Sequence, residues 1–255
     1  MSFTVAVALK RQDLTPHEPT VSAAIPFPWE KVQVAAVDQT RATSTIVAAL
    51  YHGAKEVRPF DDLELCRKEK GKGAVIAAEV KGLRAPGFDL GNSPREVAQH
   101  PEAIRGKALA LYTTNGSKTI VAVPPSVPLF AFSLFNVTAT ALAMARQARS
   151  LPHAVIACAG TEGEAALDDL LAAGLLAETL LTLGGEPRGD GVHLALSVAR
   201  AWQGRELPCL FQSQAGQNLL AVGLEEDLPF CAQKDRFPVV VMRSADGALR
   251  KLELV

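Results

Sequence analysis

The sequence predicts an α/β fold with a largely parallel or mixed β-sheet. Short apolar runs rich in β-branched residues alternate with segments whose apolar residues recur at helical spacing. This alternation is typical of parallel strands joined by covering helices. We interpret as strands the runs 3–9, 32–37, 55–60, 73–78, 107–113, 128–133 and 153–158.

Helices are expected between these strands, and two have recognisable ends. The helix expected at 43–52 stops before Gly53, because glycine is the usual residue just beyond a helix C-terminus. The helix expected at 62–70 has Asp61 as its predicted N-cap. The other helices of this half are expected at 94–100, 116–123 and 136–149.

The second half is expected to be mostly helical and to close with a β-hairpin. Its helices are predicted at 166–183, 192–203 and 210–222. The segments PVVVMRS and ALRKLELV then flank Ala245-Asp246-Gly247, which indicates a hairpin with a glycine-containing turn.

No linker is evident, so residues 1–255 are treated as one chain unit, with a division into lobes 1–150 and 151–255 left open. The proline-rich segment 11–31 is expected to be a surface excursion.

Composition restricts the possible partners. The 255 residues are 48% hydrophobic, enough for a sizeable core, and the net charge of −1 provides no global field for nucleic acid or an anionic membrane. The four cysteines form no CxxC pair, which favours a reducing cytoplasm over a disulfide framework. No apolar run approaches the ~18 residues that span a bilayer. We therefore expect a cytoplasmic protein with a small-molecule partner and leave a homo-oligomer open.

The segment VQVAAVDQTRATST is the most informative stretch. An apolar strand ends at Asp38, Arg41 and three hydroxyl residues follow, and a helix begins. Backbone N–H groups at a helix start favour bound anions, and arginine grips phosphate or carboxylate with paired hydrogen bonds. The alternative is an ordinary helix cap without a ligand.

Other predicted strands also end in polar residues. Glu79 follows 73–78, the sequence Thr-Asn-Gly-Ser-Lys follows 107–113, and Ala-Gly-Thr follows 153–158. Ligands of parallel sheets bind at the carboxyl ends of the strands, so one shared polar site is favoured over independent caps.

Two loops leave alternatives open. The glycine-rich loop 79–94 either packs over a site or is a solvated loop ending in a helix cap. Residues 113–118 either cradle phosphate through backbone N–H groups or form an Asn-Gly hairpin turn. Neither contains a Walker A or GxGxxG pattern.

Asp168 and Asp169 precede a long apolar helix. They either stabilise the helix dipole or serve as Mg²⁺ ligands, because magnesium prefers a few carboxylates together with waters and a substrate phosphate. The five histidines show no paired zinc-binding spacing, and no GxSxG motif is present.

Taken together, these segments resemble the 2-phosphosulfolactate phosphatases, the ComB family. The resemblance covers residues 38 to 235, and its specificity comes from the pieces occurring in this order. They are DQTRATSTIVAAL, EVKGLRAPGFDLGNSP, TTNGSKTI, FNVTATA, CAGTEGEAALDDLLAAG and GLEEDLPFCAQKD.

The resemblance implies a three-layer α/β/α fold and a Mg²⁺-dependent phosphatase. The family reaction hydrolyses 2-phosphosulfolactate to sulfolactate and phosphate, a step in coenzyme M synthesis. The residues expected at the metal are Asp38, Glu79, Asp168 and Asp169. The residues expected to be catalytic are Asp38, Arg41, Asp89 and Asn115. The residues expected to bind the polyanionic substrate are Arg41, Thr43, Lys81, Arg84, Asn92, Thr114, Asn115, Gly116, Ser117, Lys118, Asn136, Gly160 and Thr161.

The chain departs from the family pattern at a few positions. Gln39 and Thr40 stand where apolar residues are usual, Asp168 replaces a glutamate, and Val137 replaces a small alanine. Because the charged set is retained, the resemblance implies retained phosphatase chemistry. The alternatives are a phosphatase for another small phosphorylated hydroxy acid, and a non-catalytic anion-binding protein on the same scaffold.

Overall fold

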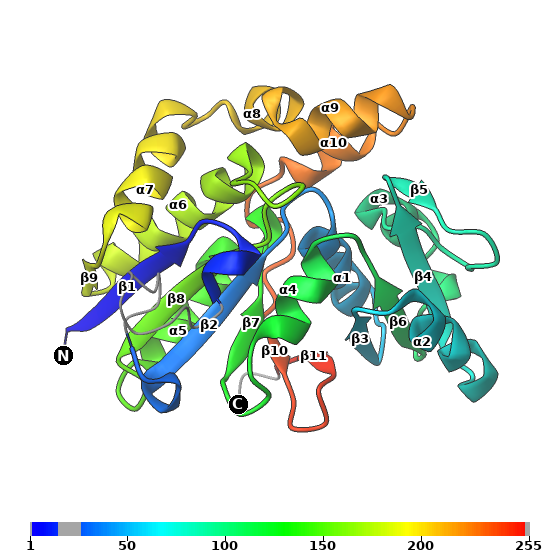
Figure 1. Ribbon diagram of the computed structural model, residues 1–255, viewed down its shortest axis with the longest axis horizontal. Coiled ribbons are helices and arrows are strands. Elements are labelled where there is room, and N and C mark those ends of the chain that lie inside the picture. The colour runs from blue at the N-terminus through cyan, green and yellow to red at the C-terminus, as the bar shows by residue number, and fades with distance from the viewer. Residues whose placement is uncertain (1, 15–26, 253–255) are drawn as a thin grey trace.

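The computed structural model describes residues 2–14 and 27–252, in which helices cover both faces of one β-sheet (Figure 1). The predicted runs are all strands, with ends shifted by a few residues. The strands are β1 Phe3–Ala8, β2 Val32–Val37, β3 Glu56–Phe60, β4 Val75–Val80, β5 Leu83–Arg84, β6 Ala108–Tyr112, β7 Leu129–Ala131, β8 His153–Cys158, β9 Gly185–Pro187, β10 Val241–Arg243 and β11 Leu249–Lys251.

The sheet contains two sets of parallel strands joined through an antiparallel hairpin. Its order is β5-β4-β6-β3-β11-β10-β7-β2-β8-β1-β9. Strands β4, β6 and β3 form one parallel set, and β7, β2, β8, β1 and β9 form the other. The predicted hairpin β10–β11 pairs antiparallel with β7 on one side and with β3 on the other. The sheet is therefore mixed, and the C-terminal hairpin lies in its middle.

Ten α-helices occur in the described part of the chain, together with short 3₁₀ turns at 11–14, 29–31, 69–72, 101–103 and 134–136. None of these helices is both long enough and apolar enough to cross a membrane. The helices are α1 Ala42–Tyr51, α2 Leu63–Lys68, α3 Pro94–Gln99, α4 Gly116–Ala122, α5 Val137–Gln147, α6 Leu167–Thr182, α7 Asp190–Ala201, α8 Glu206–Gln212, α9 Gln214–Ala221 and α10 Asp227–Cys231.

The alternation of side chains along β2 shows the three layers. Val34 and Ala36 belong to the core that includes Ile46 of α1. Ala35 and Val37 point the other way, into the core that includes Leu171 of α6. Because side chains of a strand alternate between faces, burial on both sides requires the mostly apolar sequence of β2. Its one polar side chain, Gln33, is buried and donates to the carbonyl oxygens of Met144 and Leu151. The three-layer α/β/α prediction is confirmed.

Three details differ from the prediction. Residues 210–222 are not one helix, because the backbone at Ser213 is extended and separates α8 from α9. The Ser213 hydroxyl accepts a hydrogen bond from the Gly216 amide and so caps α9. The N-cap of α2 is Asp62 rather than Asp61. Strands β5 and β9 and helix α10 were not predicted, because they are too short to show a periodic pattern.

Of the predicted surface excursion, residues 15–26 lie outside the described residues, and its two ends are the 3₁₀ turns at 11–14 and 29–31.

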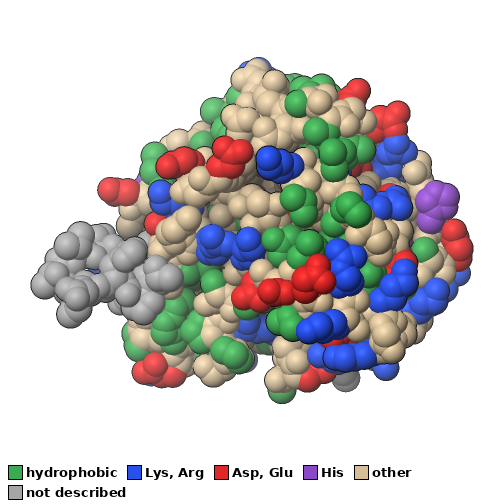
Figure 2. All heavy atoms as spheres, turned by 45° about the vertical axis from the view of Figure 1, so that its right-hand side comes forward, with side chains coloured by type: hydrophobic (Ala, Val, Ile, Leu, Met, Phe, Trp, Pro, Cys, Tyr) green, Lys and Arg blue, Asp and Glu red, His purple; other side chains and the backbone are tan. Residues whose placement is uncertain are grey.

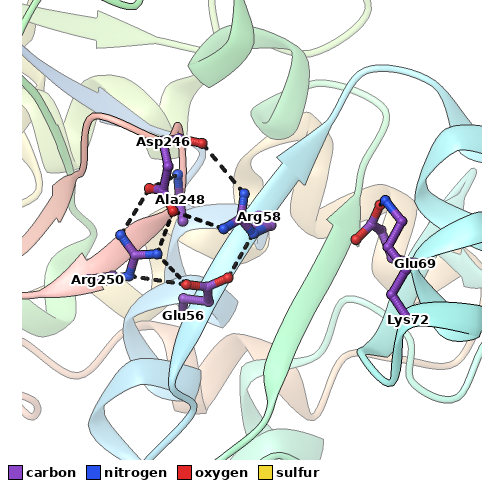
Figure 3. Close-up of polar contacts among 7 residues, drawn as sticks. All are labelled: Glu56, Arg58, Glu69, Lys72, Asp246, Ala248 and Arg250. Atoms are coloured by element: carbon purple, nitrogen blue, oxygen red, sulfur yellow. Dashed lines mark hydrogen bonds and ion pairs between the residues drawn. The ribbon is translucent and has the colours of Figure 1, made fainter.

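Four charged residues attach the hairpin to β3, as Figure 3 shows. We call Glu56, Arg58, Asp246 and Arg250 the hairpin charge cluster. The guanidinium of Arg58 donates to Glu56 at 2.7 Å and to Asp246 at 2.9 Å. Arg250 pairs with the same two carboxylates. Each acid therefore has two arginine partners, and each arginine has two acids.

Candidate functional site

The residues that follow β2, β4, β6 and β8 meet at one cavity of about 450 Å³. Helix α9 and the residue after it form an additional wall. The lining residues from the strand ends are Asp38, Thr40, Arg41, Glu79, Lys81, Gly82, Asn92, Thr114, Asn115, Gly160, Thr161, Glu162, Asp168 and Asp169. Those from the α9 wall are Ala215, Asn218, Leu219, Ala221 and Val222.

Asp38 lies where β2 passes into α1. Its carboxylate accepts a hydrogen bond from the Ala42 amide at 3.1 Å, as a helix-start acceptor does. Burial raises the pKa of Asp38 to about 7, and the nearby carboxylates of Asp168 and Glu79 add to this rise. A β-carbon on Gly116 would stand 2.6 Å from Asp38 Oδ2, so only glycine fits beside this carboxylate.

Glu79, near the end of β4, connects this strand to two loops. One carboxylate oxygen accepts from the Gly82 amide at 2.8 Å, and the other accepts from the Thr114 amide at 2.6 Å. The side chain therefore links the end of β4 to the turn before β5 and to the loop after β6. By binding these two amides, Glu79 holds the Gly82 turn and the Thr114 loop together in the cavity wall.

Asp168 and Asp169, in the first turn of α6, have different surroundings. Asp169 accepts from the backbone amides of Gln39 at 2.8 Å and Gly160 at 2.9 Å. Burial, together with the charges of Asp168 and Asp38, raises its pKa well above the ordinary value. Asp168 is equally buried, and burial also raises its pKa. Its Oδ1 atom has no hydrogen-bond partner within the described residues, so it is available to a ligand.

Arg41 lines the cavity, but both of its terminal nitrogens are engaged. Nη1 donates to Asp227 at 2.7 Å, and Nη2 donates to the Gly82 carbonyl oxygen at 2.7 Å. The neighbouring Lys81 also lines the cavity, and within the described residues its amine makes no ion pair.

The structure does not bring three of the predicted charged residues to the cavity. Asp89 pairs with Lys70 at 2.5 Å and accepts from the Ile76 amide. Arg84 pairs with Glu96 at 2.5 Å. The Lys118 amine lies 5.6 Å from the ring centroid of Tyr112. The sequence places all three near strand ends, but none of them lines the cavity.

Three predicted neutral residues are fully buried, and their side chains are engaged in hydrogen bonds with the backbone. Thr43 exchanges hydrogen bonds with the backbone of Asp38, as the helix-cap alternative expects. Ser117 does the same with Thr113. Asn136 accepts from the Ser133 amide and donates to the Val239 carbonyl oxygen. Gly116 touches the site only by making room for Asp38.

The remaining predicted residues do line the cavity. They are Asn92, Thr114, Asn115, Gly160 and Thr161. The hairpin alternative for 113–118 is excluded, because these residues form a strand-to-helix turn that opens α4. Loop 79–94 is ordered with Phe88 and Leu90 buried, and Ser93 at its end caps α3. Asn92 is buried, and its Oδ1 atom has no partner within the described residues.

The cavity lining is strongly acidic. Five carboxylates line it, whereas Arg41 and Lys81 are the only cationic side chains in its lining. Elsewhere the charges are mixed, and Figure 2 shows basic and acidic side chains intermixed on one face. The lining carboxylates are Asp38, Glu79, Glu162, Asp168 and Asp169. In the described part of the chain, no three His, Cys, Asp or Glu side chains are grouped so as to hold a metal ion by themselves.

Sequence reasoning missed Glu162, Asp227 and the α9 wall. Leu219 and Val222 of this wall lie close to Gly82, since a β-carbon on that glycine would be 3.7 and 3.6 Å from them. The helical spacing of 210–222 indicated an apolar face, but nothing local indicated what that face would cover. Asp227 stands 186 residues after its partner Arg41, so no spacing rule could connect them.

Comparison with known proteins gives a consistent family. A family model described as 2-phosphosulpholactate phosphatase matches residues 25–246. A protein of Thermus thermophilus named probable 2-phosphosulfolactate phosphatase is 43% identical over 218 residues, which cover 84% of this chain and 89% of that protein. Proteins of the same name from Pseudothermotoga lettingae and a Synechococcus species are each 34% identical, over 84% and 86% of this chain and 91% and 89% of their own lengths.

Proposed function

The chain belongs to the 2-phosphosulpholactate phosphatase family, and on this premise we propose that it hydrolyses 2-phosphosulfolactate to sulfolactate and phosphate with the help of Mg²⁺. In a host that makes coenzyme M, the reaction would be a step of that synthesis. The reaction would take place in the cavity at the ends of β2, β4, β6 and β8.

The observation that carries the metal requirement is the acidic lining of the cavity. A substrate with phosphate, sulfonate and carboxylate groups would be repelled by five carboxylates facing two cations. A bound divalent cation would remove this conflict, because it neutralises both the acids and the substrate phosphate.

The residues fit such a cation. Magnesium is commonly held by one or two carboxylates together with waters and substrate phosphate, so a group of three protein ligands is not needed. Asp38 and Asp168 would hold it, since Asp168 Oδ1 has no partner among the residues the structure describes, while both oxygens of Glu79 and of Asp169 already accept backbone N–H groups. When bound, Mg²⁺ would polarise the phosphoryl group and stabilise the charge that develops on its oxygens.

The other lining residues would bind and orient the substrate. Lys81 supplies a positive charge at the cavity. Asn92 and Asn115 present amide groups. The buried Asn92 oxygen, which has no partner in the described part of the chain, suits a hydroxyl or a metal-bound water. Asp169 and Glu79 would hold the backbone around the site in place.

The test is phosphate release from 2-phosphosulfolactate by the purified protein, with Mg²⁺ and with EDTA. We expect Mg²⁺-dependent release, and its loss in Asp38→Asn. A parallel series with phospholactate and other small phosphorylated hydroxy acids identifies the preferred ester. Absence of release from every ester with Mg²⁺ present would contradict the proposal. Ligand binding that falls in Asp38→Asn/Glu79→Gln, in a protein that never turned over, would favour the non-catalytic alternative.

A further inference from the structure

Arg41 and Asp227 form an ion pair buried on both sides. Their side chains are only 3% and 4% exposed, and the Nη1–Oδ2 distance is 2.7 Å. The second carboxylate oxygen of Asp227 accepts from the Ser93 hydroxyl at 2.6 Å. Asp227 of α10 thus binds the guanidinium, and Ser93 at the start of α3 binds Asp227 in turn.

The same guanidinium holds the turn that carries Lys81. Arg41 Nη2 donates to the Gly82 carbonyl oxygen, and the Gly82 amide donates to Glu79. Both polar backbone groups of Gly82 are therefore fixed by buried side chains. Lys81, one residue earlier, has a φ of +52°, a left-handed conformation that L-residues adopt at a cost of about 1 kcal/mol or more and keep where their surroundings impose it.

Stability alone does not explain the ion pair. Replacing a buried ion pair with well-packed apolar residues is often neutral or stabilising. An apolar pair, however, could not donate to the Gly82 carbonyl oxygen. The planar guanidinium provides donors in a fixed fork, so fixing one side with Asp227 also fixes the direction of the other.

We propose that Asp227 is a positioning residue that acts through Arg41 and Gly82 to hold the Lys81 amine at the cavity. Arg41 is then primarily a connector between α10 and the turn after β4. Lys81 is the cation that meets the anionic substrate. The expected change in KM rests on the proposed phosphatase function. The link from Asp227 through Arg41 to Gly82 does not depend on that function.

The first experiment compares Asp227→Asn with the matched control Glu226→Gln. Both remove one carboxylate charge from neighbouring positions, but Glu226 is exposed and pairs with Arg95 on the surface. For Asp227→Asn we expect a KM raised about tenfold, the equivalent of ~1.4 kcal/mol, with kcat changed less than about threefold. Glu226→Gln should behave as the unmodified protein.

A double-mutant cycle then tests whether Asp227 acts through Lys81. In a Lys81→Ala background, Asp227→Asn should change KM by less than about twofold, because the group it positions is gone. Independent effects that multiply would overturn the role of Lys81. If the chain turns over no ester, the dissociation constant of inorganic phosphate with Mg²⁺, measured by calorimetry, replaces KM in the same cycle.

Hydrogen exchange provides a measurement that needs no activity. The amides of residues 79–84, which include the Gly82 N–H bonded to Glu79, should exchange faster in Asp227→Asn than in Glu226→Gln. Because Asp227→Asn leaves a buried arginine without its partner and could unfold the protein, Arg41→Met/Asp227→Leu serves as a second variant. It should fold, and it should show the same faster exchange.

The outcomes separate the two proposals. Unchanged exchange at 79–84 in both Asp227 variants would overturn the positioning link, whatever the activity. Faster exchange and coupled phosphate binding, in a protein without turnover, would support the link and reject the phosphatase function.

Discussion

Two groups of charged side chains in this molecule differ in charge balance. In the hairpin charge cluster, two carboxylates face two guanidiniums, and every acid is paired. Burial alone would raise the pKa of Glu56, but its hydrogen bonds with Arg58 and Arg250 outweigh this and lower it. In the cavity, five carboxylates face two cations, and the pKa values of Asp38, Asp168 and Asp169 are raised.

The opposite directions of the pKa shifts distinguish a structural cluster from a binding site. An acid with a lowered pKa stabilises the fold when ionised, whereas an acid with a raised pKa opposes it when ionised. Acids that oppose folding and lie together in a cavity are the arrangement that the proposed Mg²⁺ would stabilise, because it supplies the missing positive charge. Four predictions follow from this contrast, ordered by expected effect.

The largest effect is expected from Asp38→Asn. Loss of this carboxylate should reduce kcat by about 1,000-fold or more, because it removes a proposed metal ligand at the reacting phosphate. The matched surface change Asp246→Asn should leave kcat unaltered and lower the stability. Steady-state kinetics and thermal unfolding of both variants test this difference between the cavity and the hairpin charge cluster. An Asp246→Asn variant that lost as much kcat as Asp38→Asn would contradict it.

The second prediction concerns Mg²⁺ and stability. At pH 8 and 100 times its Kd, Mg²⁺ should stabilise the protein by about 2.7 kcal/mol, or about 5–10 °C in Tm. The double variant Asp38→Asn/Asp168→Asn should show no such shift, whereas Arg250→Ala should keep it. An equal shift in the double variant would place the cation elsewhere.

The third prediction is a pH dependence without metal. The folded pKa of Asp38 is about 7, above the value of 3.8 for an unperturbed aspartate, so the folded state holds more protons than the unfolded state between these values. Its stability should therefore fall as the pH rises from 5.5 to 8. Asp38→Asn should lose this contribution and become more stable than the unmodified protein at pH 8 in EDTA. Thermal unfolding at both pH values tests this. A stability that rises from pH 5.5 to 8 would refute the raised pKa of Asp38.

The smallest effect is expected at the hairpin charge cluster. Arg250→Ala should cost about 1 kcal/mol or less, which is about 2–4 °C in Tm, because the pair is partly exposed and Arg58 still binds Glu56. KM and kcat should be unchanged. Altered kinetics would show that the hairpin is coupled to the cavity.

Much of the fold was predictable because it depends on local patterns. The apolar run of β2, burying alternate residues on both faces, and the glycine after α1 each act within a few residues. Four of the five cavity carboxylates, Asp38, Glu79, Asp168 and Asp169, were predictable as well, because each lies at or shortly after a predicted strand end, whereas Glu162 was missed. Lys118 shows the limit of this reasoning, since it lies near a strand end but α4 directs its amine to Tyr112.

The remaining features depend on contacts between distant parts of the chain. The unusual Gln39 is an example, because its amide nitrogen donates to the Cys231 carbonyl oxygen and its oxygen accepts from the Leu134 amide. These two hydrogen bonds accommodate a polar side chain at this fully buried position. From the local sequence, Arg41 was expected to bind an anion. Its ion pair with Asp227 could be recognised only in the folded structure.

The position of the C-terminal hairpin bears on how the protein is assembled during synthesis. Leu249 of β11 pairs with Val57 of β3, and Met242 of β10 pairs with Phe130 of β7. The strands that join the two parallel sets are thus the last strands of the described chain to leave the ribosome. Each set can begin to form earlier, but the continuous sheet can close only when residues 241–251 have emerged. Until then the inner edges of β3 and β7 lack their partner strands, and unpaired strand edges are the part of a folding chain that favours aggregation.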